Sequence, residues 1–134
     1  MVMDFYPWDV RCDVPTVLEG SSHDAVTAEF RYCVEEPYAV TAVFTAKDVE
    51  VEWTFARDLL SEGLAGSVGE GDVLVSPGVP GRVRMLLRSP EGAASLLCDR
   101  HAVERFLSES FRAVPAGGEA ARLDIDELID ALTG

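Results

Sequence analysis

Residues 49–64, with the sequence VEVEWTFARDLLSEGL, decide the fold. In the first half, apolar and polar residues alternate, which is the period of a β-strand with one buried face. The apolar members are Val49, Val51, Trp53 and Phe55. From Ala56 the pattern changes to that of a short helix, which Gly63 or Gly66 is expected to end. The stretch therefore predicts a strand that leads directly into a helix, with Trp53 in the core.

Further strands are predicted on both sides of this stretch. Residues 26–34 alternate between apolar and polar side chains, and residues 38–44 carry small and β-branched residues on their second face. Later apolar runs lie at 73–75, 83–87 and 93–98, separated by turns that contain proline and glycine. Because the connections are short, neighbouring strands are expected to pair antiparallel.

Two helices are predicted after the strands. Residues 100–113 place apolar side chains at helical spacing, and Asp99 is the expected N-cap. Asp124 and Glu127 have the spacing of a capping box, so a terminal helix is expected to begin there. That helix has an apolar face and an acidic face, and a helix this short is marginal alone. It must dock on its own domain or on a partner.

These elements predict the α+β class. We expect antiparallel β-sheets, as a meander, as two sheets or as a barrel, with about three helices packed against them. A chain of 134 residues suits one domain, so residues 1–134 are expected to form it. Residues 1–10 are expected to be a flexible or partner-contacting segment.

The composition limits the classes of function. With 11 Lys and Arg against 24 Asp and Glu, the net charge is −13, which disfavours contact with phosphate backbones and anionic lipids. The hydrophobic share of 48% is enough for a packed core. No secretory signal or transmembrane run is readable. Three cysteines far apart indicate reduced thiols and a cytoplasmic setting.

A search for catalytic or metal-binding chemistry finds little. Cys98 and His101 have the spacing of half a zinc site, but no second ligand pair is near, so a buried thiol beside an ordinary histidine is favoured. Glu50 and Glu52 would lie roughly 7 Å apart on one strand face, and a solvated face is favoured over a glycosidase pair. The glycines of 66–71 are interpreted as a loop. No catalytic residue, metal or cofactor is predicted.

Several segments resemble the SsgA-like proteins of sporulating actinobacteria. The resemblance spans about residues 26–132, and its most specific block is W-x-F-A-R-D-L-L-x-E-G-L at 53–64. Other matching segments are P-Y-A-V-x-A-x-F at 37–44, G-D-V at 71–73, S-P-E-G at 89–92, V-P at 114–115 and D-x-D at 124–126. The motif residues are Tyr38, Trp53, Phe55, Arg57, Asp58, Leu59, Gly63, Gly71, Asp72, Pro90, Glu91 and Gly92.

The resemblance implies a non-enzymatic regulator of sporulation-specific cell division. Family members act in septum-site selection and septation, and the resemblance implies recruitment of the tubulin-like protein FtsZ through protein contacts. The implied fold is a pair of antiparallel sheets with helices, similar to the plant Whirly fold. A homotrimer is implied, with other SsgA-like proteins and FtsZ as partners, in the cytoplasm at division septa.

Two groups of residues are candidates for partner contact. The first is aromatic and consists of Phe5, Tyr6 and Trp8, which could instead plug a barrel end. The second is acidic and consists of Glu50, Glu52, Asp126 and Asp130. The alternative function is single-stranded nucleic-acid binding, which rests on the Whirly-like fold and on a basic cluster. For that cluster, Arg82, Arg84 and Arg88, ion pairing is the favoured role.

Overall fold

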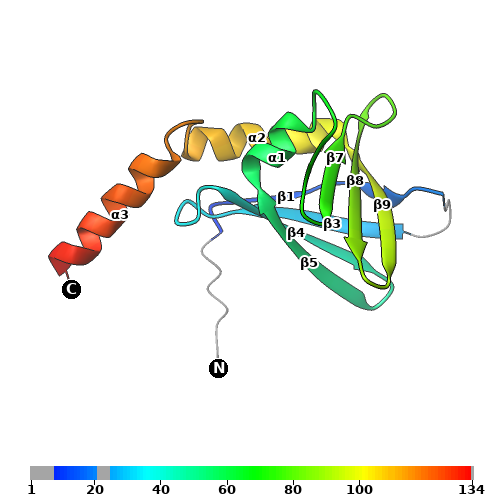
Figure 1. Ribbon diagram of the computed structural model, residues 1–134, viewed down its shortest axis with the longest axis horizontal. Helices are drawn as coiled ribbons and strands as arrows, with labels where there is room; N and C mark the ends of the chain where they lie inside the picture. Colours follow the sequence, from blue (N-terminus) through cyan, green and yellow to red (C-terminus); the bar gives the residue numbers. More distant parts are fainter. Residues whose placement is uncertain (1–7, 21–24, 134) are drawn as a thin grey trace.

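A computed structural model describes residues 8–20 and 25–133, except for the side chains of residues 25, 122 and 124–126. Within these residues the strands come first and the longer helices last (Figure 1). In chain order the elements are β1 Val10–Asp13, β2 Thr16–Leu18, β3 Ala25–Tyr32, β4 Ala39–Ala46, β5 Val49–Ala56, α1 Arg57–Glu62, β6 Val68–Glu70, β7 Val73–Ser76, β8 Arg82–Ser89, β9 Gly92–Asp99, α2 Arg100–Ala113 and α3 Glu119–Thr133.

The strands form one antiparallel sheet that curls into a nearly closed barrel. In the described part of the chain the order is β5-β4-β3-β2-β9-β8-β7-β6, and β1 pairs with β3 beside β2. Two meanders, β3–β5 and β6–β9, are therefore joined through the short strand β2. The α+β class with a barrel-like antiparallel sheet is confirmed.

An aromatic cluster forms the centre of the barrel. Phe30 of β3 is fully buried, and its ring makes edge contacts with Phe44, Phe55 and Phe106, at centroid distances of 6.3, 6.4 and 5.6 Å. Phe106 comes from α2, which therefore covers one end of the barrel (Figure 1). The predicted cap of this helix is confirmed, because the Ala102 amide donates to the Asp99 carboxylate at 2.9 Å.

Three expectations about element boundaries were wrong. The strands β1 and β2 lie where none was predicted, and β6 includes Gly69, which was expected in a loop. These strands have three or four residues, too few to show a period, and pairing with a neighbour makes them regular. The last helix begins at Glu119, so Asp124 is inside it and does not cap it.

Strand β5 is less buried than its alternation predicts. Phe55 is buried as expected, but Val49 and Val51 are 63% and 46% exposed, and Trp53 is only partly buried. Trp53 as a core residue is therefore corrected to a residue packed at the edge of the core. The reason is position: β5 is an edge strand, and its first half lies at the barrel end opposite α2.

Gly63 ends α1 at a point where no side chain fits. A Cβ built on Gly63 would overlap the Val75 side chain of β7. We expect Gly63→Ala to lower the free energy of unfolding by about 1–3 kcal/mol through overpacking. Urea unfolding measures this, with Gly66→Ala as the control, because a Cβ there meets nothing within 4 Å. Equal stability of the two variants would contradict the close packing of α1 on β7.

Candidate functional site

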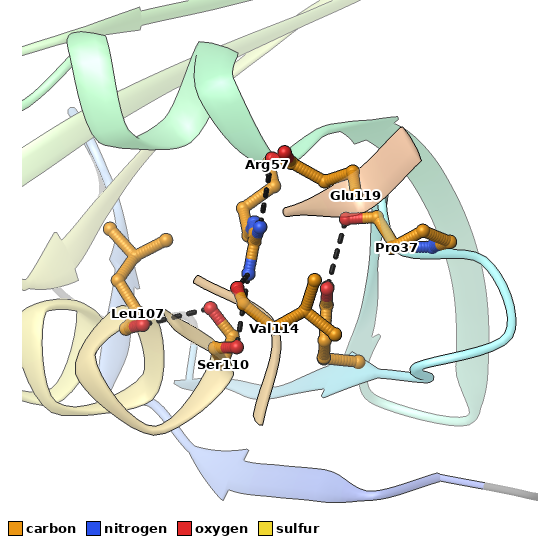
Figure 2. A network of polar contacts seen from close by, with 7 residues as sticks. Pro37, Arg57, Leu107, Ser110, Val114 and Glu119 are labelled. Carbon is orange, nitrogen blue, oxygen red and sulfur yellow. Dashed lines mark hydrogen bonds and ion pairs between the residues drawn. The ribbon is translucent and has the colours of Figure 1, made fainter. Parts of the chain in front are cut away.

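The buried side chain of Arg57 joins three parts of the chain (Figure 2). Arg57 opens α1 directly after β5, and its backbone amide donates to the Tyr38 carbonyl at 2.7 Å. Its Nη1 donates to the carbonyls of Ser110 and Val114 at 3.0 and 2.8 Å, where α2 ends. Its Nη2 donates to Glu119 Oε2 at 2.9 Å, where α3 begins. One guanidinium therefore fixes the junction between α2 and α3.

The surroundings of Arg57 favour its charged form and that of Glu119. The Arg57 guanidinium stacks on the rings of Phe111 and Tyr32, with Cζ 4.1 and 4.9 Å from their centroids. It also meets the carbonyl end of α2, where the helix dipole is negative. The hydrogen bond from Arg57 holds the pKa of Glu119 below its ordinary value of 4.5. The pair is nearly inaccessible to water, with both side chains at most 7% exposed.

This pair predicts a pH-dependent part of the stability. Because its pKa is lowered in the folded state, Glu119 stabilises the fold fully above its unfolded pKa, and this contribution falls as pH drops through the lowered value. We expect Glu119→Gln to cost about 1.5–3 kcal/mol at neutral pH, and the difference from wild type to shrink below pH 4.5. Urea unfolding of both proteins from neutral to acid pH measures it. A difference independent of pH would contradict the ion pair.

Beyond its first residue, α3 projects away from the barrel (Figure 1). Glu119 is buried, but every described side chain from Ala120 to Thr133 is exposed. Three apolar residues, Leu128, Ile129 and Leu132, lie on one side of the helix and are 58%, 50% and 76% exposed. We call these three residues the α3 stripe. Of the two expected alternatives, docking on its own domain or on a partner, the first is not seen for the described side chains after Glu119.

The barrel end opposite α2 holds an apolar trough of about 840 Å³. It lies between the β4–β5 and β8–β9 hairpins, whose tips lie near each other in Figure 1. Its lining is mainly apolar and includes Val26, Phe44, Val49, Val51, Trp53 and Leu96. The apolar residues of β5 that are exposed therefore face this trough.

The rim of the trough carries basic residues although the chain is strongly acidic. Lys47, the single lysine of the sequence, lies at the β4–β5 turn, and Arg88 lies near the end of β8. Both are exposed, and Glu91 of the β8–β9 turn is the acidic group of the lining. The trough is thus an apolar surface with two cations on its edge. Sequence reasoning missed this rim, because Lys47 and Arg88 are far apart in the chain and only the barrel brings them to one trough.

The predicted partner-contact residues do not form one surface. Phe5 and Tyr6 lie outside the described residues, and the side chain of Asp126 is not described. Trp8 is partly buried, with the Arg31 guanidinium 5.7 Å from its ring, and the trough lining does not include it. Glu50 and Glu52 are exposed on β5, whereas Asp130 is exposed on α3. The acidic candidates therefore belong to two separate parts of the molecule.

The motif residues near Arg57 in the sequence pack in the core or support helix α1 and Arg57. Phe55 and Leu59 are buried in the core, and Asp58 is exposed in the first turn of α1, where the helix dipole favours an acid. Tyr38 is 50% exposed and contributes its backbone carbonyl to Arg57. The sequence marked Arg57 as a motif residue, but nothing local to it indicated its partners.

The remaining motif residues shape two turns at the same end of the barrel, beside the end of β8. Gly71 has a φ of +60° between β6 and β7, and the Asp72 carbonyl accepts from the Arg88 amide at 2.9 Å. Pro90 and Glu91 form the turn between β8 and β9, with Ser89 paired to Gly92. Glu91 and Gly92 also line the trough.

The other sequence candidates for chemistry lie apart from these surfaces. Cys98 is fully buried, and burial raises its thiol pKa to about 11, whereas His101 is exposed. Over residues 8–20 and 25–133, no three His, Cys, Asp or Glu residues gather as a possible metal site. Arg84 is held by Glu19 through two hydrogen bonds at 2.8 and 2.7 Å, so the favoured ion-pair role is confirmed for this arginine. No helix of the described chain is long and apolar enough to span a bilayer.

The fold and the site define a class of protein, a small antiparallel barrel. Helix α2 covers one end of this barrel, and an apolar trough lies at the other end. Helix α3 projects from the barrel and is bound at its first residue by Arg57. Residues 26–119 match the family described as Streptomyces sporulation and cell division protein, SsgA. The chain belongs to this family, and the resemblance seen in the sequence is confirmed.

Relatives and solved structures agree with this assignment. The chain is 49% identical over 131 residues to a sporulation-specific cell division protein SsgB of Kineococcus radiotolerans, which covers 92% of this chain and 79% of the relative. It is 44% identical over 124 residues to the SsgB of Streptomyces coelicolor, and the alignment covers 88% of this chain and 90% of that relative. A solved SsgA-like sporulation-specific cell division protein from Thermobifida fusca has a TM-score of 0.83 at 34% identity, covering 94% of this chain and 97% of that chain. These relatives support a role of the chain in sporulation cell division.

Proposed function

We propose that this protein regulates sporulation-specific cell division without chemistry of its own, by holding division proteins such as FtsZ at the septum site. The observation that carries the proposal is the pair of exposed apolar surfaces, the trough and the α3 stripe. Exposed apolar patches of this kind mark interaction sites in proteins. The proposal places the protein in the cytoplasm at septa, as one domain that forms a homo-oligomer and meets other SsgA-like proteins.

The acidic edge of β5 is the proposed contact for FtsZ. Glu50 and Glu52 are exposed on β5, which is an edge strand. Among the described strands, only β4 pairs with β5, so the other edge of β5 has no strand beside it. An edge strand offers unpaired amides and carbonyls to a partner strand, and the two carboxylates select a basic one. We propose Trp8 and Asp130 as additional contact residues for other SsgA-like proteins.

Co-sedimentation with polymerised FtsZ tests this contact. The wild-type protein is expected to pellet with the polymers, and Glu50→Lys with Glu52→Lys to lose most of the bound fraction, because rim charges steer association. The matched control is Glu35→Lys with Glu36→Lys, a second exposed acidic pair, which should bind as wild type. If the wild-type protein remains in the supernatant, direct recruitment of FtsZ is wrong.

A further inference from the structure

The apolar trough has the size of a site for a small molecule. Its volume of about 840 Å³ is in the range of pockets that hold organic ligands, and the mouths of β-barrels are among the places where such ligands bind. The lining combines two buried side chains, Phe44 and Leu96, with two exposed ones, Val49 and Val51. A ligand in the trough would therefore remove the apolar surface of the two valines from water.

The polar groups of the lining are confined to its edge. The charged and hydroxyl-bearing residues lie at or beside the β4–β5 and β8–β9 turns, and they are Lys47, Arg88, Ser89 and Glu91. An extended peptide carries an amide and a carbonyl at every residue, and these groups need partners when they are buried. An aliphatic chain has no such groups. The lining thus favours an aliphatic chain whose polar end lies at the hairpin turns.

Lys47 indicates the charge of that polar end. It is the single lysine of the sequence, and none of the ion pairs in the described part of the chain includes it. Its φ of +56° is the one positive value of a non-glycine residue among the described residues. A two-residue hairpin turn favours asparagine or glycine at such a position, and strained positions cluster at functional sites. An exposed ammonium held there suits an anionic head group.

The other charges near the trough have been weighed against Lys47. Arg88 is in the lining, but alternation along β8 places its side chain on the outer strand face, so it is the weaker contributor. Glu91 is the acidic residue of the lining. Asp48 follows in the same turn outside the lining, and Glu50 lies on the strand face opposite the trough. Two cations against one acid make the lining positive in a chain of net charge −13.

We propose that the trough binds a free fatty acid anion, with the acyl chain along β5 and the carboxylate at Lys47. The source is a single molecule and not a bilayer, because an anionic membrane surface is repelled by a net charge of −13. Salt screens the repulsion of one carboxylate beyond about 8 Å and leaves its contact with Lys47. The inference goes beyond the proposed function, since it gives the trough a small ligand and leaves the α3 stripe and the edge of β5 to protein partners.

Titration of the full chain with cis-parinaric acid, a fluorescent fatty acid, tests the proposal. We expect saturable binding of one molecule per chain, with energy transfer to the bound probe from Trp53, which lines the trough. Trp53→Phe keeps an aromatic wall, so it should still bind the probe but lose most of the energy transfer. The other tryptophan, Trp8, is not in the lining.

Displacement of the probe by unlabelled compounds measures the two parts of the ligand separately. From octanoate to dodecanoate, each added methylene group that enters the trough should tighten binding by up to about four-fold. Dodecanoate should displace the probe at a lower concentration than dodecanol does. Dodecylamine should be the weakest of the three, because its positive charge meets that of Lys47.

Matched variants test the head-group contact and the apolar wall. Lys47→Gln should weaken dodecanoate binding about three- to five-fold and leave dodecanol binding unchanged. Its control is Arg105→Gln, which removes an exposed cation of α2. Val51→Asn should weaken binding of both compounds at least about five-fold, whereas Val79→Asn, at a similarly exposed valine outside the lining, should not. Circular dichroism checks that every variant is folded.

The proposal is overturned if the probe does not bind saturably, if Trp53→Phe keeps the energy transfer, or if Val51→Asn binds as Val79→Asn does. Equal displacement by dodecanoate and dodecylamine, or no effect of Lys47→Gln, also overturns it. Flotation with phosphatidylglycerol vesicles checks the source of the ligand, because protein that floats with vesicles but does not bind the monomeric probe contradicts the proposal. FtsZ takes no part in these measurements, so their failure leaves the proposed contact of β5 untouched.

Discussion

Arg57→Ala is expected to lower the free energy of unfolding by about 3–5 kcal/mol. The substitution leaves the Glu119 carboxylate buried without its cation and removes the donors of the Ser110 and Val114 carbonyls. It also opens space between the rings of Tyr32 and Phe111. Urea unfolding followed by fluorescence and circular dichroism measures the loss.

Arg57→Lys and a double variant serve as controls for this prediction. Lysine keeps the charge but cannot donate in the planar geometry that reaches both the end of α2 and Glu119, so it should recover only part of the loss. In Arg57→Met with Glu119→Gln, no uncompensated charge is buried, and the loss should be smaller than for Arg57→Ala. Equal stability of Arg57→Ala and wild type would show that the contacts of Arg57 with the end of α2 and with Glu119 do not stabilise the fold.

Phe30→Ala is the second large effect, and it should cost about 3–5 kcal/mol. Phe30 is fully buried, and its ring contacts three other aromatic rings from β4, β5 and α2. The substitution leaves a cavity among these three rings, and the surrounding sheet and helix are expected to relax only partly into it. The measurement is again the unfolding free energy in urea.

Trp53→Ala is the informative comparison for Phe30→Ala. The alternating pattern of β5 predicts a cost of about 3–5 kcal/mol for this tryptophan as a core residue. Since the structure places it partly exposed beside the trough, the expected cost falls to about 1–2 kcal/mol. A cost for Trp53→Ala as large as that for Phe30→Ala would mean that the trough is filled in the isolated chain.

Much of the fold was predictable because it follows local rules. The helix 100–113 was predicted with its bounds and its Asp99 cap, since both depend on neighbours within four residues. The strand that leads into α1 was predicted for the same reason. The start of α3 was not, because an ion pair with Arg57, 62 residues earlier in the chain, anchors that helix at Glu119.

The sequence by itself determined the strand and helix periods, the acidic character and the family of this protein. Only the tertiary structure decided which apolar residues are covered and what Arg57 does. The alternation of β5 predicts that Val49 and Phe55 are both buried, yet Val49 is 63% exposed and Phe55 is 7% exposed. The physical reason is that burial depends on what lies opposite a side chain in space, and α2 covers one end of the barrel while the other stays open.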